Sequence, residues 1–117
     1  MILPLIKNLF LPLFLALYFV FHSCSADINN LPQGELIDTV YSPDETYAIN
    51  TYLVNGGATV DFSVRCEVVE KSSDESRNIY WEYKCDTADI EWIDDTTVKI
   101  NGKELNVLTD SYDWRDR

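Results

Sequence analysis

The chain has 117 residues, enough for one modest domain, and a formal net charge of −11. Lys7 is the one charged residue in the first twenty-odd positions, so the remainder has 9 − 1 = 8 basic residues against 20 acidic ones, a charge of −12. Such a charge repels the phosphates of nucleic acids and anionic lipids, and we expect no nucleic-acid partner.

The first 24 residues are mainly apolar and end at a cysteine. The run from Leu9 to Phe21, LFLPLFLALYFVF, is interrupted only by Pro12. A helix that spans a bilayer needs about 20 such residues. A shorter run that follows Lys7 and precedes small polar residues is typical of an export signal. We expect residues 1–24 to form a hydrophobic signal or membrane-anchor helix.

Three ways of processing this segment remain open. Cleavage before Cys24 would leave its thiol to carry a diacylglycerol, as in bacterial lipoproteins. The sequence FHSC matches such a signal in part: Ser23 fits, whereas Phe21 and His22 replace the usual aliphatic and small residues. Cleavage after Ala26 would release a secreted chain, and no cleavage would leave an anchor. We favour lipidation of Cys24, which attaches the protein to the outer face of a membrane, and all three alternatives place the folded part outside the cytoplasm.

The rest of the chain has the period-two alternation of β-strands. We expect residues 25–35 to be a polar tether and residues 36–117 to form an antiparallel β domain. Strands are predicted at residues 36–41, 47–54, 58–69, 79–85, 89–93, 96–100 and 103–108. In the longest strand, the alternation places on one face Ala58, Val60, Phe62, Val64, Cys66 and Val68.

Turn signals separate these strands. SPDET at 42–46 predicts a turn, NGG at 55–57 a tight reversal, and NG at 101–102 a two-residue hairpin. The charged, serine-rich stretch 70–78 is predicted to be a long loop. The fold class is therefore all-β: a small antiparallel meander sheet or sandwich of about seven strands.

Cys66 and Cys85 form a candidate disulfide. If Cys24 is lipidated or lies in the membrane, these two cysteines remain as a pair, and a hairpin of 58–69 with 79–85 would place both on the buried face of neighbouring strands. An oxidising exterior would favour a bond that closes a loop of about 20 residues and contributes roughly 3 kcal/mol. The alternative is two buried thiols.

The chain offers little for catalysis. Its one histidine, His22, lies in the front segment, which leaves the domain without histidine-dependent nucleophiles or zinc ligands. Asp61 and Glu67 share the polar face of one strand but lie about 20 Å apart, too far for a glycosidase pair. We expect Arg65 and Glu82 to form a solvated salt bridge. We predict no catalytic residue, no metal site and no cofactor.

Aromatic residues are numerous for so small a domain. If the second face of the sheet is exposed, Tyr52 and Tyr80 would form a binding platform there. The alternative is that both rings pack in the core and across strands.

Six segments carry a resemblance: LPQGELI, SPDETY, YLVNGGATVDFSVR, NIYWEY, TADIEWIDDTTVKINGKELNV and YDWR. Over residues 31–115, they resemble an uncharacterised family, a domain of unknown function, of short membrane-attached proteins of Gram-positive, Bacillus-type bacteria. The resemblance implies a short membrane segment or lipoprotein signal and a β-rich outer domain, and it supplies no activity or catalytic residue. Cys66 and Cys85 stand where that family's pattern has a glycine and a polar residue.

These features together predict a non-enzymatic module attached to the membrane that binds a protein or polymer of the cell envelope. One alternative is an envelope hydrolase that uses carboxylates. Another is a structural accessory lipoprotein without a ligand.

Overall fold

The structure is a computed structural model that describes residues 27–116. The expected signal or anchor and the candidate lipidation site Cys24 lie outside the described residues. Within residues 27–116, no helix is long and apolar enough to cross a bilayer.

The described residues form eight β-strands and one short 3₁₀ helix, so the predicted all-β class is confirmed. In chain order the elements are β1 (Glu35–Tyr41), β2 (Tyr47–Val54), β3 (Ser63–Glu70), β4 (Ser76–Tyr83), β5 (Ile90–Trp92), β6 (Thr97–Ile100), β7 (Lys103–Asn106), β8 (Tyr112–Asp113) and η1 (Trp114–Asp116). The predicted bounds of β2 are correct, and those of β1 and β5–β7 differ by at most two residues at either end.

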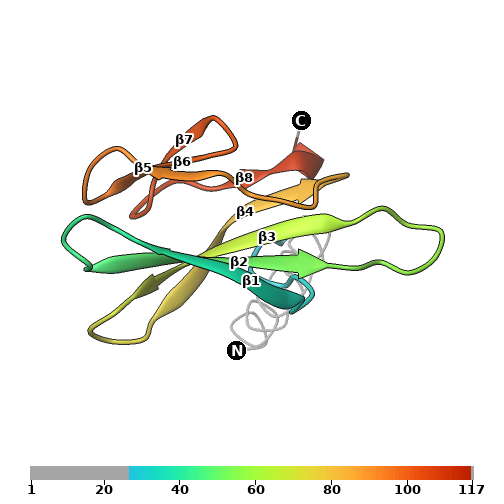
Figure 1. The fold of residues 1–117 in the computed structure, drawn as a ribbon, viewed down its shortest axis with the longest axis horizontal. Coiled ribbons are helices and arrows are strands. Elements are labelled where there is room, and N and C mark those ends of the chain that lie inside the picture. Colours follow the sequence, from blue (N-terminus) through green and yellow to red (C-terminus); the bar gives the residue numbers. More distant parts are fainter. Residues whose placement is uncertain (1–26, 117) are drawn as a thin grey trace, which may run out of the picture.

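The strands form two sheets, which Figure 1 shows one above the other. The larger sheet has the order β1-β2-β3-β4-β8, and the smaller one has the order β5-β6-β7. All neighbours are antiparallel except β4 and β8, where Tyr80 pairs with Tyr112 in parallel. The prediction of a wholly antiparallel fold is wrong at this point, because two residues of a polar tail show no periodicity that could mark a strand.

The hydrophobic core lies between the two sheets, as in a small sandwich. The larger sheet supplies Ile49, Val64, Cys66, Val68, Ile79 and Tyr80. From β6, β7 and the residue after β7 come Val98, Ile100, Leu105 and Val107. The face of the larger sheet that contacts this core is called the inner face below, and the opposite face is called the outer face.

Two predicted turns are confirmed. At 42–46, the Ser42 N–H donates to the Tyr47 carbonyl over 2.8 Å, which closes the β1–β2 hairpin. At the β6–β7 hairpin, Asn101 and Gly102 have φ of 48° and 84°. Two consecutive residues with positive φ are what a type I′ turn requires, and this is why Asn-Gly predicts it.

The long strand predicted at 58–69 is wrong in its first five residues, 58–62. β3 begins at Ser63, which pairs with Val54, and residues 55–62 form an exposed loop in place of a tight reversal. Gly57 has φ of 108° and donates its N–H to Asn55 Oδ1, so the backbone closes on itself instead of joining the ladder. Val60 and Phe62 are therefore exposed although the alternation assigned them to the core.

The next hairpin is tighter than predicted. β3 extends to Glu70 and β4 begins at Ser76, so the expected loop of 70–78 shrinks to the turn 71–75. Asp74 has φ of 58° at this turn, and the Glu70 N–H donates to the Glu75 carbonyl.

A β-bulge in β4 reverses the predicted faces of that strand. Cys66 pairs with Tyr80 and the adjacent Glu67 pairs with Asn78, so Ile79 is the extra residue. One extra residue shifts the alternation by one, because successive side chains point to opposite faces. Tyr80 therefore lies on the inner face, and Trp81 lies on the outer face opposite Arg65.

Candidate functional site

The outer face carries a buried arginine at its centre. Arg65 pairs with Tyr52 of β2 on one side and with Trp81 of β4 on the other. Its side chain is buried, and the expected solvated pair with Glu82 does not form. Register explains the difference, because Glu82 is opposite Val64 and so lies on the inner face.

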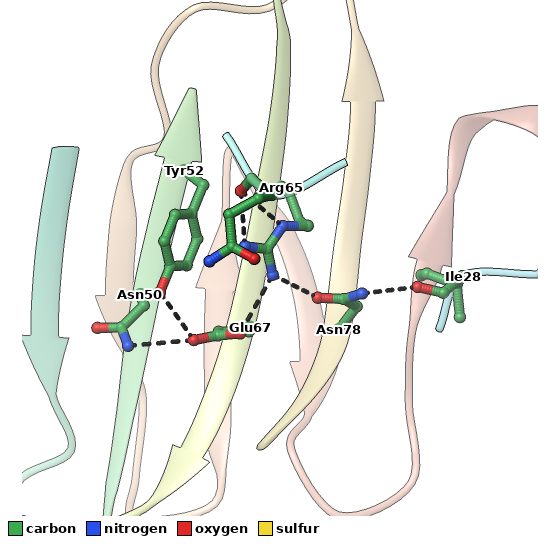
Figure 2. A network of polar contacts seen from close by, with 7 residues as sticks. Ile28, Asn50, Tyr52, Arg65, Glu67 and Asn78 are labelled. Atoms are coloured by element: carbon green, nitrogen blue, oxygen red, sulfur yellow. Dashed lines mark hydrogen bonds and ion pairs between the residues drawn. The ribbon is translucent and has the colours of Figure 1, made fainter. Parts of the chain in front are cut away.

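The N-terminal segment 27–33 covers this arginine. The Arg65 guanidinium donates from Nη2 and Nε to the Gln33 carbonyl over 2.8 and 3.3 Å. Asn78 donates from Nδ2 to the Ile28 carbonyl over 2.8 Å. Part of the stretch expected to be a tether is thus docked on the sheet, as Figure 2 shows.

Gly34 allows the docked segment to pass close to β2. A Cβ at this position would lie 2.8 Å from the Leu53 carbonyl oxygen and 2.9 Å from Val54 Cγ2. Its φ of 76° is also in the left-handed region that favours glycine. Any other residue at position 34 would push the segment away from Arg65.

The Nη1 group of Arg65 donates to side chains of the sheet itself. Nη1 donates to Glu67 Oε2 over 3.1 Å and to Asn78 Oδ1 over 2.8 Å. The guanidinium carbon lies 4.0 Å from the centre of the Tyr52 ring, a cation–π contact. A buried charge with this many partners orders the surface around it, because each partner would otherwise lose a hydrogen bond.

Glu67 connects Arg65 to the strand next to it. Glu67 Oε1 accepts from the Tyr52 hydroxyl over 3.0 Å and from Asn50 Nδ2 over 3.3 Å. Burial, and then the hydrogen bond to Glu67, raise the pKa of Tyr52. The Tyr52 hydroxyl therefore stays a neutral donor at physiological pH. This chain of contacts runs across β2, β3 and β4 (Figure 2).

A polar hollow of about 290 Å³ lies beside this network, and part of the docked segment lines it. Its lining residues are Asn29, Leu31, Gln33, Arg65, Glu67, Ser76, Arg77 and Asn78. Both arginines already donate to carbonyls, Arg77 to those of Val107 and Asp110. The hollow therefore offers amide and carboxylate groups instead of a free cation.

The structure does not bring Tyr52 and Tyr80 together. Tyr80 lies on the inner face, is 2% exposed, and its ring packs against Tyr112 with centroids 5.3 Å apart. Its hydroxyl accepts from Asn101 Nδ2 over 3.2 Å, and burial raises its pKa to about 12. The two-tyrosine platform is therefore corrected, because Tyr80 is a core residue.

Tyr41 of β1, and not Tyr80, is the second tyrosine exposed on the outer face. In the β1–β2 ladder, Leu36 pairs with Tyr52 and Tyr41 pairs with Ala48, which places both β1 side chains on the outer face. Leu36 is 52% exposed and Tyr41 is 50% exposed. Together with their neighbours on the outer face, these residues form a surface that we call the β1–β2 strip: Leu36, Thr39, Tyr41, Asn50 and Tyr52.

Sequence reasoning missed Leu36 and Tyr41 because both fit a half-buried strand. The signal that identifies them is positional: β1 is an edge strand, and every residue from Glu35 to Thr39 is exposed. The smaller sheet packs against the inner face, and Trp92 Nε1 donates to the Val40 carbonyl over 3.2 Å, so the smaller sheet does not cover these outer-face side chains.

Cys66 and Cys85 are both free thiols in the structure. Both lie in or against the core cluster, as the hairpin argument expected. Tyr80, however, is the residue directly opposite Cys66, and Cys85 lies beyond the end of β4. Burial raises the pKa of Cys66 to about 12, so this thiol is inert near neutral pH. The disulfide stays a prediction.

The carboxylates that the sequence offered for a hydrolase, Asp61, Glu67 and Glu82, lie on different parts of the domain. Glu67 lies on the outer face, whereas Glu82 lies on the inner face, where it accepts from the Tyr112 hydroxyl over 2.9 Å. Asp61 belongs to the exposed loop before β3. In the part of the chain that the structure describes, no three histidine, cysteine or acidic side chains gather as metal ligands would.

These features define a small two-sheet β domain whose N-terminal segment is docked on the outer face by a buried arginine. The chain belongs to DUF5412, a family of unknown function, which it matches over residues 2–117. The expected membership of an uncharacterised family is confirmed. Neither the curated proteins nor the solved structures contain a match to the chain.

Proposed function

We propose that this protein is a membrane-tethered module on the outer face of a cell membrane that binds a protein or polymer of the cell envelope through the β1–β2 strip. The front segment 1–24 attaches it to the bilayer, either through a lipid on Cys24 or as an uncleaved helix. The domain binds and does not catalyse.

The observation that carries the binding proposal is the division of the outer face. The half over β3 and β4 is closed by residues 27–33 and Arg65, whereas the half over β1 and β2 is open. The open half combines the apolar Leu36, two tyrosine rings and the polar Thr39 and Asn50, whose side chains are joined by a 2.8 Å hydrogen bond. Exposed aromatic rings with adjacent amide and hydroxyl groups are typical of binding surfaces.

Attachment is tested by the intact mass of the protein isolated from its native membrane. A mass that begins at Cys24 and includes acyl chains supports lipidation, and a mass that retains Met1 supports an anchor. A chain that begins at Asp27 and is recovered in the medium contradicts attachment. The same spectrum, recorded with and without reductant, shows whether Cys66 and Cys85 are bridged.

Binding is tested by photo-crosslinking in intact cells that produce the full chain. A photoreactive amino acid replaces Tyr41 in one variant and Leu108 in a control variant, since Leu108 is 59% exposed but lies outside the strip. We expect a discrete crosslinked product from position 41 that is absent from position 108. Identical patterns from the two positions would contradict a specific binding strip.

A further inference from the structure

The exposed large hydrophobic residues of the described domain gather mainly at one end. Two are at the start of β1, Leu36 and Ile37, and two are in the loop between β2 and β3, Val60 and Phe62. The register joins them, because the start of β1 pairs with the end of β2, where this loop begins. Figure 1 shows the loop projecting beyond the ends of the strands.

Local contacts fix the loop 55–62, in which Val60 and Phe62 are exposed. A Cβ at Gly56 would lie 2.6 Å from Val60 Cγ1, so Val60 rests directly on the glycine backbone. The Val60 N–H donates to the Gly57 carbonyl over 3.4 Å, and the Phe62 carbonyl accepts from the Cys85 N–H over 3.1 Å. These contacts fix the loop locally, and Asp61 is its one charged residue.

A further β-strand is a poor match for the adjacent β1 edge. Asp38 Oδ1 accepts the Thr39 N–H over 2.9 Å, which occupies a donor of the edge strand. The β1–β2 register also shifts between Leu36 and Asp38, and bulges of this kind prevent pairing with another strand. A second copy of the chain is disfavoured as well, because each copy has a net charge of −11.

The N-terminal segment brings a lipid surface within reach of this end. Only Ser25 and Ala26 separate Cys24 from Asp27, a span of about 10 Å when extended. The Asn78 side chain donates to the Ile28 carbonyl, and Asn78 pairs with Glu67 of β3. Ser63, at the start of β3, is four residues from Glu67, a distance of about 13 Å along the strand. A chain attached to the membrane at Cys24 therefore keeps Ser63, the residue that follows the loop, within about 30 Å of the bilayer.

We infer that the loop 55–62, together with Ile37, is a second membrane contact that enters the interfacial region of the bilayer. This inference rests on the membrane attachment proposed above. The contact is hydrophobic and not electrostatic, since the acidic domain is repelled by anionic headgroups. Val60 and Phe62 insert among the lipids, and the orientation of the domain on the membrane is thereby fixed.

The test uses the full chain reconstituted in vesicles of phosphatidylcholine with brominated acyl chains, which quench tryptophan on contact. Val60→Trp places a reporter on the loop. Leu108→Trp is the matched control, because Leu108 is also exposed and lies at the opposite end, in a hollow with Tyr47, Glu70 and Ser76. The emission of the native tryptophans is subtracted with the unsubstituted chain. Phe62→Trp serves as a second loop reporter if Val60→Trp does not fold.

We expect the added emission at position 60 or 62 to shift to shorter wavelength and to be quenched, and the emission at position 108 to be unaffected. Equal quenching at the two ends, or no quenching at the loop while the chain floats with the vesicles, overturns the loop contact and leaves the attachment intact. A chain that does not float with the vesicles contradicts the attachment and the loop contact together. Stronger quenching in vesicles that contain phosphatidylglycerol contradicts a hydrophobic contact.

Discussion

The two faces of the larger sheet are closed by different physical means. On the inner face, apolar side chains of both sheets pack together, and the stabilisation follows the area removed from water. On the outer face, a single guanidinium joins strands β3 and β4 to a segment 32 residues earlier in the chain, at Gln33. The first kind of closure tolerates small shifts of side chains, whereas the second depends on each partner being in place. The outer face is therefore the one that a single substitution can open.

Ile49→Ala tests the inner face and should have the largest effect. Ile49 is fully buried in the core, so its truncation leaves a cavity and should lower the free energy of unfolding by about 4 kcal/mol. Urea unfolding followed by near-ultraviolet circular dichroism measures the loss. Ile93→Ala is the control, because Ile93 is exposed and should change stability by less than about 0.5 kcal/mol.

Arg65→Ala tests the outer face. Removal of the guanidinium takes one donor from Glu67 Oε2, from Asn78 Oδ1 and from the Gln33 carbonyl, which should cost about 3 kcal/mol. The same urea titration measures it, with Lys71→Ala as the control. The Lys71–Glu45 pair is 3.8 Å apart on the surface and should contribute little. A loss for Arg65→Ala as small as that of the control would show that the outer face is not closed by this network.

The buried tyrosine of the inner face predicts a loss of stability at high pH. Burial raises the pKa of Tyr80 from 10.0 to about 12 in the folded state. The unfolded chain therefore releases the phenolic proton first, and the stabilisation, on the order of 2 kcal/mol, is complete below pH 10 and lost as the pH rises to about 12. The free energy of unfolding, measured from pH 10 to about 12, should fall less steeply in Tyr80→Phe than in the unsubstituted chain. Equal slopes would contradict a raised pKa of Tyr80 as the cause.

Asn101 should have the smallest effect of the four because it acts at the rim of the core. Its side chain donates to the Tyr80 hydroxyl and the Thr87 carbonyl, and its backbone has φ of 48°. Asn101→Gly keeps the backbone conformation and loses the side-chain bonds, at a cost of about 1 kcal/mol. Asn101→Ala should cost more, because alanine also resists positive φ. Thermal unfolding of the two variants separates the contributions, and equal losses would contradict a role for the backbone angle.

Alternation in the sequence predicted most of the inner face. Val64, Cys66 and Val68 lie where the period of two places them, and Asn-Gly at 101–102 forms the expected hairpin. The same pattern failed for Val60 and Phe62, because the turn that Asn55 and Gly57 form delays the start of β3 to Ser63, later than the hydrophobic pattern predicts. It also failed for Tyr80, because a bulge has no signature in the pattern of polar and apolar residues.

The candidate binding surface was predicted in part. Tyr52 was assigned to the correct face, but the sequence alone does not show that β1 is an edge strand, which is what leaves Leu36 and Tyr41 exposed. Nor does it show that Arg65 is buried, because the groups that cover it come from residues 27–33. Contacts between distant segments of polar residues have no periodicity, and only the three-dimensional structure reveals them.

The docked N-terminal segment determines which half of the outer face is closed and which is open. Nuclear Overhauser contacts in the isotope-labelled full chain test it most directly. We predict contacts between the Asn78 side-chain amide and Ile28, and between the Arg65 Hε proton and Gln33. Random-coil chemical shifts for residues 27–33 without these contacts would contradict the closed outer face and, with it, the division on which the binding proposal rests.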